Sequence, residues 1–191
     1  QITVGTPEEL IRMMEHDQLD IIYILDAPRW SESWVKAMEV AEPVVFVASP
    51  AFWAQKYAEC EKNGTVKWST KTVGQEEISV RQITLDQILQ EPFFLTEKNA
   101  NYRQALDQHL ASCRCCLSPV LEISDTAFII QMLEQSRGLS FLPLFAVQKQ
   151  IWEGTLAAVE VDDVEISMYR QIFYHKNKFR TREMEQFIIF A

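Results

Sequence analysis

The sequence predicts an α/β fold, in which strands and helices alternate along the chain. Two observations support this class. Nearly continuous apolar runs of strand length, such as "LDIIYIL" at 19–25, suit parallel strands that are covered on both faces. Between such runs lie segments with a helical apolar period, opened by capping residues such as Thr6 and Thr181. The alternation of the two patterns throughout the chain is typical of α/β proteins.

The first helix is expected to begin at Pro7 and to end near residues 16–18. Thr6 can cap it, Pro7 suits its first position, and Glu9 completes a Thr-x-x-Glu capping box. A strand is then expected in 19–25, where the apolar run follows directly.

The second strand signal is "EPVVFVASP", bounded by Pro43 and Pro50. Ser49 and Pro50 then open a short helix that is expected to run through Trp53 and Tyr57. The segment 61–82 is polar and contains an Asn-Gly turn signal, so it is interpreted as a loop or a hairpin.

The third region, beyond residue 83, predicts two helices and a strand between them. Thr84 caps a short helix over 85–90, and a strand follows Pro92. Asn101 is expected to cap the helix that contains residues 102–110.

A single βαβ unit is predicted next, with strands at 120–123 and 139–142. Ser124 is expected to cap the intervening helix, and Gly138 to end it. Because such crossovers are right-handed, both strands are expected to be parallel in one sheet. A helix at 144–151 and further strands in 153–161 and 166–175 complete the chain, before the helix that Thr181 caps.

Charge and composition exclude several classes of function. The 191 residues carry a net charge of −9, which a phosphate backbone repels, so this chain by itself is not expected to bind nucleic acid. No apolar run approaches the ~20 residues of a membrane helix, and no membrane partner is expected. The opening "QITVGTPEEL" lacks the features of a signal peptide, which favours a cytoplasmic protein.

Four cysteines raise the question of a metal site or a redox pair. They are Cys60, Cys113, Cys115 and Cys116, and His109 lies four residues before the first of the "CRCC" cluster. Zinc ligands are usually spaced by two to four residues, and adjacent cysteines rarely share one ion. We therefore expect reduced thiols and no metal.

Catalytic motifs are absent from the sequence. It contains no glycine-rich phosphate loop, no G-x-S-x-G and no H-E-x-x-H. His16, His109 and His175 are far apart in sequence, although a Cys–His pair could still meet in space. The protein is therefore expected to be non-enzymatic and to need no cofactor.

Three stretches resemble the effector-binding domain of LysR-type transcriptional regulators. "EELIRMMEHDQLDIIYI" is similar to the family's leucine-rich helix, Leu-Asp pair and apolar strand. "EPVVFVASPAFWA" is similar to the next strand and the turn that follows it. "EISDTAFIIQMLEQSRGLSFLPLFA" is similar to a helix and strand of the second lobe, with Arg137-Gly138-Leu139 in place of Gly-x-Gly-Ile.

The resemblance implies two Rossmann-like lobes with a ligand cleft between them, as in type 2 periplasmic binding proteins. Lobe one would comprise residues 1–90 and 166–191, and lobe two residues 91–165. Relative to the family, the N-terminal helix-turn-helix is absent from this sequence, and the first strand and helix of lobe one also have no counterpart. DNA would then be bound only through the missing N-terminal domain, and the resemblance implies a homodimer.

Eight residues are expected to bind the effector in the cleft. In open α/β sheets, ligands bind beyond the carboxyl ends of strands, next to helix N-termini. These residues are Thr6, Thr96, Lys98, Asn99, Tyr102, Ser124, Asp125 and Pro143.

The residue types favour a small carboxylate or an amino acid as the effector. Helix N–H groups, hydroxyls and Lys98 suit an anion, whereas Asp125 would favour an amine on the same ligand. Two alternatives remain beside the regulator: a free-standing solute-binding protein of the same fold, and a small enzyme with a reactive residue in the cleft.

Overall fold

In the computed structural model, the chain forms two compact units. The first comprises Gln1–Glu42 with Ser167–Ala191, and the second comprises Pro43–Ile166. Residues 43–90 thus fall in the second unit, whereas the sequence interpretation grouped them with the first lobe. The physical reason is pairing and packing: residues 44–48 pair with strands of the second unit, and Ile83 belongs to its core. The residues that the structure describes are 1–55, 67–73, 76–135, 137–162, 164 and 166–191.

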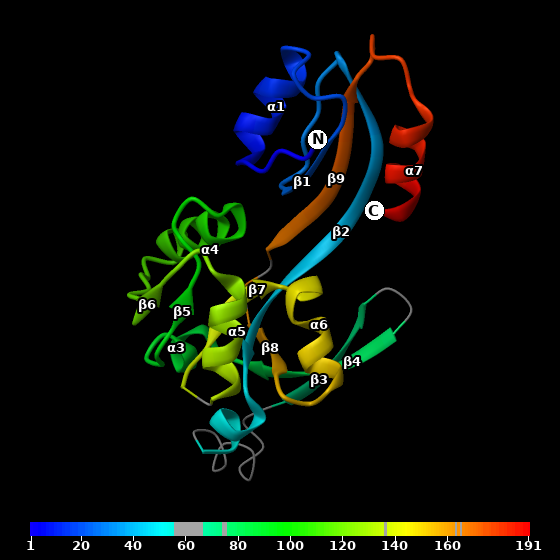
Figure 1. Ribbon diagram of the computed structural model, residues 1–191. Helices are drawn as coiled ribbons and strands as arrows, with labels where there is room; N and C mark the ends of the chain where they lie inside the picture. Colours follow the sequence, from blue (N-terminus) through cyan, green and yellow to red (C-terminus); the bar gives the residue numbers. More distant parts are fainter. Residues whose placement is uncertain (56–66, 74–75, 136, 163, 165) are drawn as a thin grey trace. The chain divides into compact units, whose positions relative to one another are not determined.

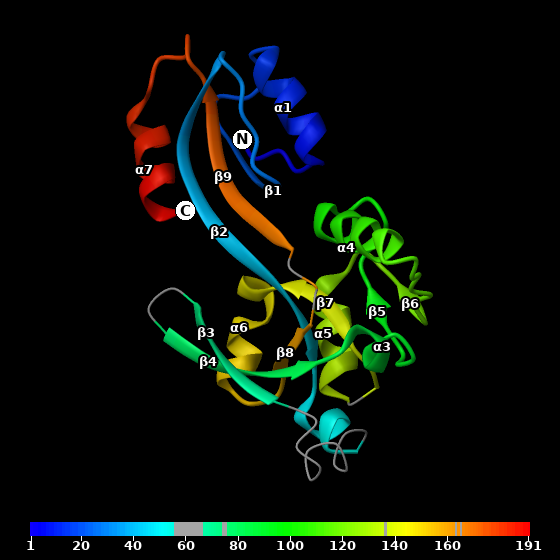
Figure 2. The ribbon, with the colours of Figure 1, turned by 180° about the vertical axis from the view of Figure 1, so that it is seen from behind.

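The first unit contains helix α1 (Pro7–Glu15), strand β1 (Ile22–Asp26), the start of β2 (Trp34–Ala48), β9 (Ser167–His175) and helix α7 (Arg182–Phe190). Strands β1, β9 and β2 are neighbours in that order, and Figures 1 and 2 show α1 beside β1 and α7 beside β2. The core of this unit lies between α1 and the strands.

Strand β1 corrects the expectation of a parallel strand covered on both faces. Among the strands that the structure describes, it pairs with β9 alone, antiparallel, with Ile22 opposite Phe173, and it lies at the sheet edge. Ile22 and Ile24 are buried, whereas Tyr23 between them is exposed. The continuous apolar run therefore marks one buried face and one partly open face.

The predicted capping box of α1 is confirmed. The Thr6 hydroxyl accepts a hydrogen bond from the Glu9 N–H (3.3 Å), and the Thr6 N–H donates to the Glu9 carboxylate (2.9 Å). Arg29 pairs with Glu8 in the first turn (2.8 Å) and with Asp26 at the end of β1 (2.5 Å). The polar and charged groups at the start of α1 are therefore paired with side chains of its own unit.

The second unit contains the rest of β2 and the remaining elements of the chain. They are β3 (Lys67–Val73), β4 (Glu76–Ile83), α3 (Leu85–Ile88), β5 (Phe94–Leu95), α4 (Asn101–Ser112), β6 (Leu121–Glu122), α5 (Thr126–Glu134), β7 (Ser140–Pro143), α6 (Leu144–Trp152) and β8 (Ala157–Val161). Strand β2 pairs antiparallel with β7 and β8, β4 pairs parallel with β8, and β5 pairs parallel with β6.

Helices cover both faces of this sheet. Because side chains alternate along a strand, Val45 and Val47 of β2 point to one face, and Phe46 and Ala48 point to the other. The first face packs against α5 and α6, and the second packs against α3 and α4. This two-sided burial is the Rossmann-like layering that the resemblance implied.

Strand β2 is much longer than the predicted segment. It begins at Trp34, and Pro43 lies inside it rather than at its boundary. The first half of β2 is only partly buried, so it lacks the continuous apolar run that identifies a strand from sequence; its pairing in the sheet extends it. Ser49 accepts a hydrogen bond from the Phe52 N–H (3.1 Å) at the predicted helix start, and residues 50–55 are helical.

The segment interpreted as a loop or hairpin contains a hairpin. Strands β3 and β4 pair antiparallel from Lys67 with Gln82 to Val73 with Glu76. The predicted Asn-Gly turn at 63–64 and the end of the preceding helix at Tyr57 lie outside the described residues.

The predicted βαβ unit is only partly correct. Strand β6 pairs with β5, and β7 pairs with β2, so β6 and β7 are not direct neighbours. A single parallel bridge between Phe93 and Leu139 joins the start of β5 to the start of β7. Gly138 does not cap α5, which ends at Glu134. A Cβ atom at Gly138 would lie 2.3 Å from the Pro92 carbonyl oxygen, so this glycine permits the close approach of the two strands.

Among the helices that the structure describes, none combines the length and the hydropathy that a membrane span requires.

Candidate functional site

The candidate site is built at the carboxyl ends of β5 and β6. These two strands are parallel, with Phe94 opposite Leu121 and Leu95 opposite Glu122, so both end at the same edge. Thr96 follows the first strand and Ser124 follows the second. Helices α4 and α5 begin a few residues later, which brings two helix N-termini to this edge.

Tyr102, in the first turn of α4, connects the two helix starts. Burial raises the pKa of its phenol, whereas interactions with the hydroxyls of Thr96 and Thr126 act in the opposite direction. Its ring also packs against both hydrophobic clusters of the second unit. The structure therefore brings together two predicted site residues, Thr96 and Tyr102, with Thr126, which the sequence interpretation missed.

Thr96 presents an unused polar atom. The residue is 4% exposed, and within the described part of the chain its Oγ1 has no hydrogen-bond partner of normal geometry. The Tyr102 phenol interacts with it without completing such a bond. Because an unpartnered buried polar group costs about 1–3 kcal/mol, Thr96 is a natural partner for a ligand atom.

The start of α4 has no side-chain cap. Its N-cap residue is Ala100 rather than the predicted Asn101, and no side chain of the cap residue accepts from the first turn. The Ala100 N–H bonds the Glu97 carbonyl (3.0 Å), and this turn places Ala100 one residue ahead of the asparagine. No acidic residue lies in the first turn of α4, so its partial positive charge is not offset there.

The start of α5 is arranged in the opposite way. Asp125, not the predicted Ser124, is the N-cap, and its carboxylate accepts from the Phe128 N–H (3.1 Å). Ser124 and Asp125 are both exposed. The carboxylate supplies the negative charge that this helix N-terminus favours, so α5 is less suited to an anion than α4.

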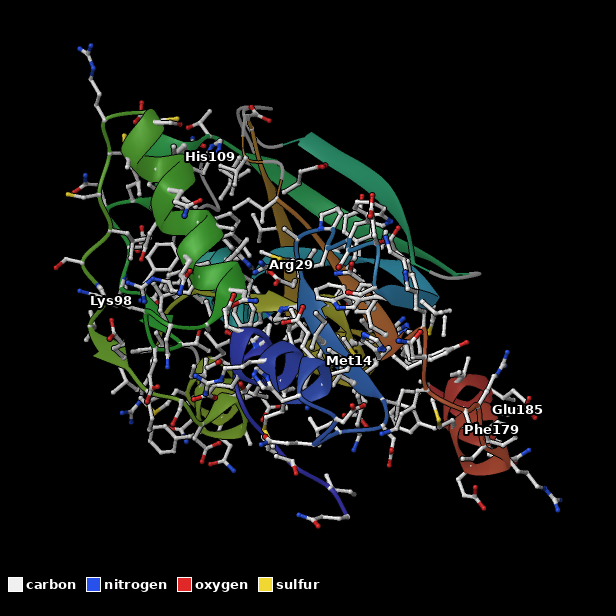
Figure 3. All side chains as sticks on the ribbon, turned by 90° about the horizontal axis from the view of Figure 1, so that it is seen from above. Met14, Arg29, Lys98, His109, Phe179 and Glu185 are labelled. Atoms are coloured by element: carbon white, nitrogen blue, oxygen red, sulfur yellow. The ribbon has the colours of Figure 1, made fainter. Side chains whose placement is uncertain are left out.

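Lys98 and Asn99 lie in the exposed turn between Thr96 and α4. In Figure 3, Lys98 lies outside the helix, whereas His109 lies on it. Of the carboxylates that the structure describes, none forms an ion pair with Lys98. Its ammonium group is therefore available close to the uncapped helix start.

Arg103 is a second site residue, after Thr126, that the sequence did not indicate. It is 2% exposed, and its guanidinium donates to the Thr96 carbonyl (2.9 Å), to Asp107 (3.0 Å) and to Glu122 (3.5 Å). It thus joins α4 to the ends of β5 and β6 and fixes the backbone of Thr96. The available sequence signal was the Arg–Asp spacing of four residues within a predicted helix.

Two predicted site residues, Pro143 and Thr6, belong to other elements of the fold. Pro143 is buried, pairs with Val44 in the sheet and is the N-cap of α6. Thr6 belongs to the first unit, where its hydroxyl and its N–H are both bonded to Glu9. Within the described residues, no three His, Cys, Asp or Glu side chains form a group that could hold a metal ion.

A mixed α/β domain with polar groups gathered at helix N-termini has the architecture of an effector-binding domain. The chain belongs to the LysR substrate binding domain family, which matches residues 76–191. This match favours a regulatory domain over a free-standing solute-binding protein, and the family consists of ligand-sensing domains rather than enzymes. The predicted family and fold class are thereby confirmed.

Individual relatives agree with this assignment. The HTH-type transcriptional activator CmpR from Synechocystis sp. is 25% identical over 101 residues, which is 53% of this chain and 33% of CmpR. The chain thus spans about a third of the length of that relative. The regulatory domain of CcmR from Synechocystis, in complex with 2-PG, is similar in fold with a TM-score of 0.66, 15% identity and coverage of 100% of this chain and 80% of that chain.

A second solved structure, the effector-binding domain of QuiR in complex with shikimate, has a TM-score of 0.64 and 10% identity. The structural alignment covers 97% of this chain and 76% of the QuiR chain. At these identities the two structures establish the fold alone.

Proposed function

We propose that this domain senses a small molecule with an anionic group, such as a carboxylate, and thereby regulates a DNA-bound LysR-type oligomer. The observation that supports the ligand class is the start of α4. There, a helix N-terminus without a side-chain cap adjoins the buried, unpartnered Thr96 hydroxyl and the unpaired Lys98.

Physical chemistry explains why these three features select an anion. Helix N–H groups and the helix dipole stabilise negative charge, and the effect is largest within the first turn. The Thr96 hydroxyl can donate to an anionic oxygen. Lys98 adds a positive charge that attracts the ligand and is screened by salt because it is exposed.

The similar structures support the same chemical class. The QuiR domain was solved with shikimate, which is a carboxylate, and the CcmR domain was solved with 2-PG. Neither ligand is assigned to this chain, because the sequence identities are 10% and 15%.

An amino-acid effector is a second candidate. Asp125 is exposed at the start of α5, and only its Oδ1 is used by the Phe128 N–H. The remaining oxygen can accept from an amine while the carboxylate of the same ligand lies at α4.

The proposal includes the oligomeric state and the DNA binding of the full regulator, which we infer from the family. The full regulator would be a cytoplasmic homodimer or higher oligomer, and it would bind DNA through a separate helix-turn-helix. Participation of Thr6, from the first unit, and of Pro143 also stays a prediction.

A thermal-shift screen of small carboxylates and amino acids tests the proposal, because a ligand that binds only the native state raises the melting temperature. Thr96→Val removes the hydroxyl and keeps the shape, and it should weaken binding of the selected anion by about 1 kcal/mol or more. Lys98→Ala should weaken binding more strongly at low salt than at high salt.

Lys149→Ala is the matched control. Lys149 is an exposed lysine on α6 that pairs with Glu153, so its loss should leave binding unchanged. Equal affinities for wild type, Thr96→Val and Lys98→Ala would contradict the proposed site.

A further inference from the structure

The cysteines at the end of α4 are not equivalent in the structure. The helix ends at Ser112 with Cys113 as its C-cap, and Arg114 adopts the left-handed conformation with φ of 59°. The Cys115 N–H bonds the Leu110 carbonyl (2.8 Å), and the Arg114 N–H bonds the Ala111 carbonyl (3.0 Å). These two bonds define a Schellman motif.

This motif assigns Cys115 a structural role. The residue after the left-handed position of a Schellman motif commonly makes a hydrophobic contact with the last helical turn. Cys115 is half-buried and packs against the core cluster that contains Leu110. Cys113 and Cys116 lie on either side of it in sequence, and both are exposed free thiols.

Cys113 also has a base beside it. Its Sγ lies 3.9 Å from Nε2 of His109, one turn earlier on α4. The imidazole is therefore the group beside the thiol that can accept its proton. Cys116 has no such neighbour among the described residues.

We propose that Cys113 and Cys116 form a thiol–disulfide exchange site that reacts with low-molecular-weight disulfides. The Cys113 thiol transfers its proton to His109, and the thiolate attacks one sulfur of the small disulfide. A Cys113 mixed disulfide forms and one small thiol leaves, carrying a proton. The Cys116 thiol then loses its proton and its sulfur attacks the Cys113 sulfur. The Cys113–Cys116 bond forms, and the second small thiolate leaves and takes up that proton.

The atoms and electrons of this reaction balance. The protein loses two hydrogens and two electrons, and the small disulfide takes them up as two thiols. The Cys-x-x-Cys spacing of Cys113 and Cys116, with a chain reversal at Arg114, suits this closure, whereas Cys115 is held by its backbone bond and its core contact. The site lies on the helix whose first turn carries the proposed effector site, but the inference does not depend on that proposal.

Oxidised glutathione and peptide mapping test the inference. Cys60 lies outside the described residues, so all variants carry Cys60→Ala. The parent should yield a Cys113–Cys116 disulfide, and Cys115→Ser should yield the same product. Cys116→Ser should retain one glutathione on Cys113, because no second thiol resolves it. His109→Gln should react severalfold more slowly while it reaches the same product.

The reaction rates of the two thiols in denaturing urea provide the reference for the unfolded chain. The faster reaction of Cys113 relative to Cys116 should disappear there, because the His109 contact is lost. Circular dichroism of each variant checks that the fold is retained. The inference is overturned if Cys113 stays reduced, if Cys115 forms the bond in place of Cys116, or if His109→Gln reacts at the parental rate.

Discussion

Helices α4 and α5 begin at the same edge of the second unit but satisfy their N-termini differently. At α5 the chain supplies its own anion, since the Asp125 carboxylate accepts from the Phe128 N–H. At α4 the N-cap is Ala100, which has no acceptor, and the neighbouring Thr96 hydroxyl is buried without a full partner. The first turn of α5 thus has an acceptor from its own chain, whereas the first turn of α4 has none from its cap residue and is suited to a ligand.

Helix α1 supports the same distinction in the first unit. Its N-terminus is closed by the Thr6–Glu9 capping box, and Glu8 in its first turn pairs with Arg29. Both α1 and α5 therefore carry their own negative charge, whereas α4 does not.

Arg103→Ala is expected to have the largest effect on stability, because Arg103 holds the start of α4 in place. Arg103→Ala removes the hydrogen bond to the Thr96 carbonyl and leaves Asp107 and Glu122 without their cation. Because the carboxylates are partly exposed, the expected loss is about 2–3 kcal/mol in the free energy of unfolding. Urea denaturation measures this loss, and the exposed Arg137→Ala provides the control. A loss equal to that of the control would show that Arg103 does not hold this region together.

The cap of α5 should have a smaller effect. Asp125→Ala removes the side-chain acceptor and should destabilise the unit by about 1 kcal/mol, whereas Asp125→Asn keeps an acceptor and should cost less. Neither change should weaken binding of a carboxylate that carries no amine at α4. If Asp125→Ala abolishes binding of such a carboxylate, the contrast between the two helix starts is wrong.

The smallest and most specific change adds the missing cap. Ala100 already has the extended conformation of a capping residue, with φ of −68° and ψ of 128°. Ala100→Asp should therefore stabilise the unit by about 0.5–1 kcal/mol while it lowers affinity for the anion, because its carboxylate competes for the same N–H groups. Thermal denaturation and calorimetric titration measure the two effects. A variant that is more stable and binds the anion as well as wild type would place the ligand elsewhere.

Local signals in the sequence predicted part of this arrangement. The capping box at Thr6 and the cap at Thr181 depend on residues three positions apart, and the structure confirms both. Ala100 replaces Asn101 as the cap of α4 because the turn from Glu97 to Ala100 fixes where the helix begins. Asp125 replaces Ser124 because both residue types are good caps, and the sequence alone does not choose between neighbours.

Longer-range features could not be read in this way. The extension of β2 back to Trp34 follows from the strands beside it, and the need for Gly138 follows from the Pro92 carbonyl 46 residues earlier in the chain. Arg103 is a surface-type residue in sequence, and only the convergence of α4 with the ends of β5 and β6 buries it.

We propose that the anionic group of the effector binds at the start of α4. The most direct test is to titrate the isotope-labelled domain with the anion that gives the largest thermal shift, and to follow the backbone amides by NMR. We expect the largest chemical-shift changes at residues 97–103, with smaller changes at 124–128. Shift changes that are largest at 124–128, or that leave 97–103 unaffected, would contradict it.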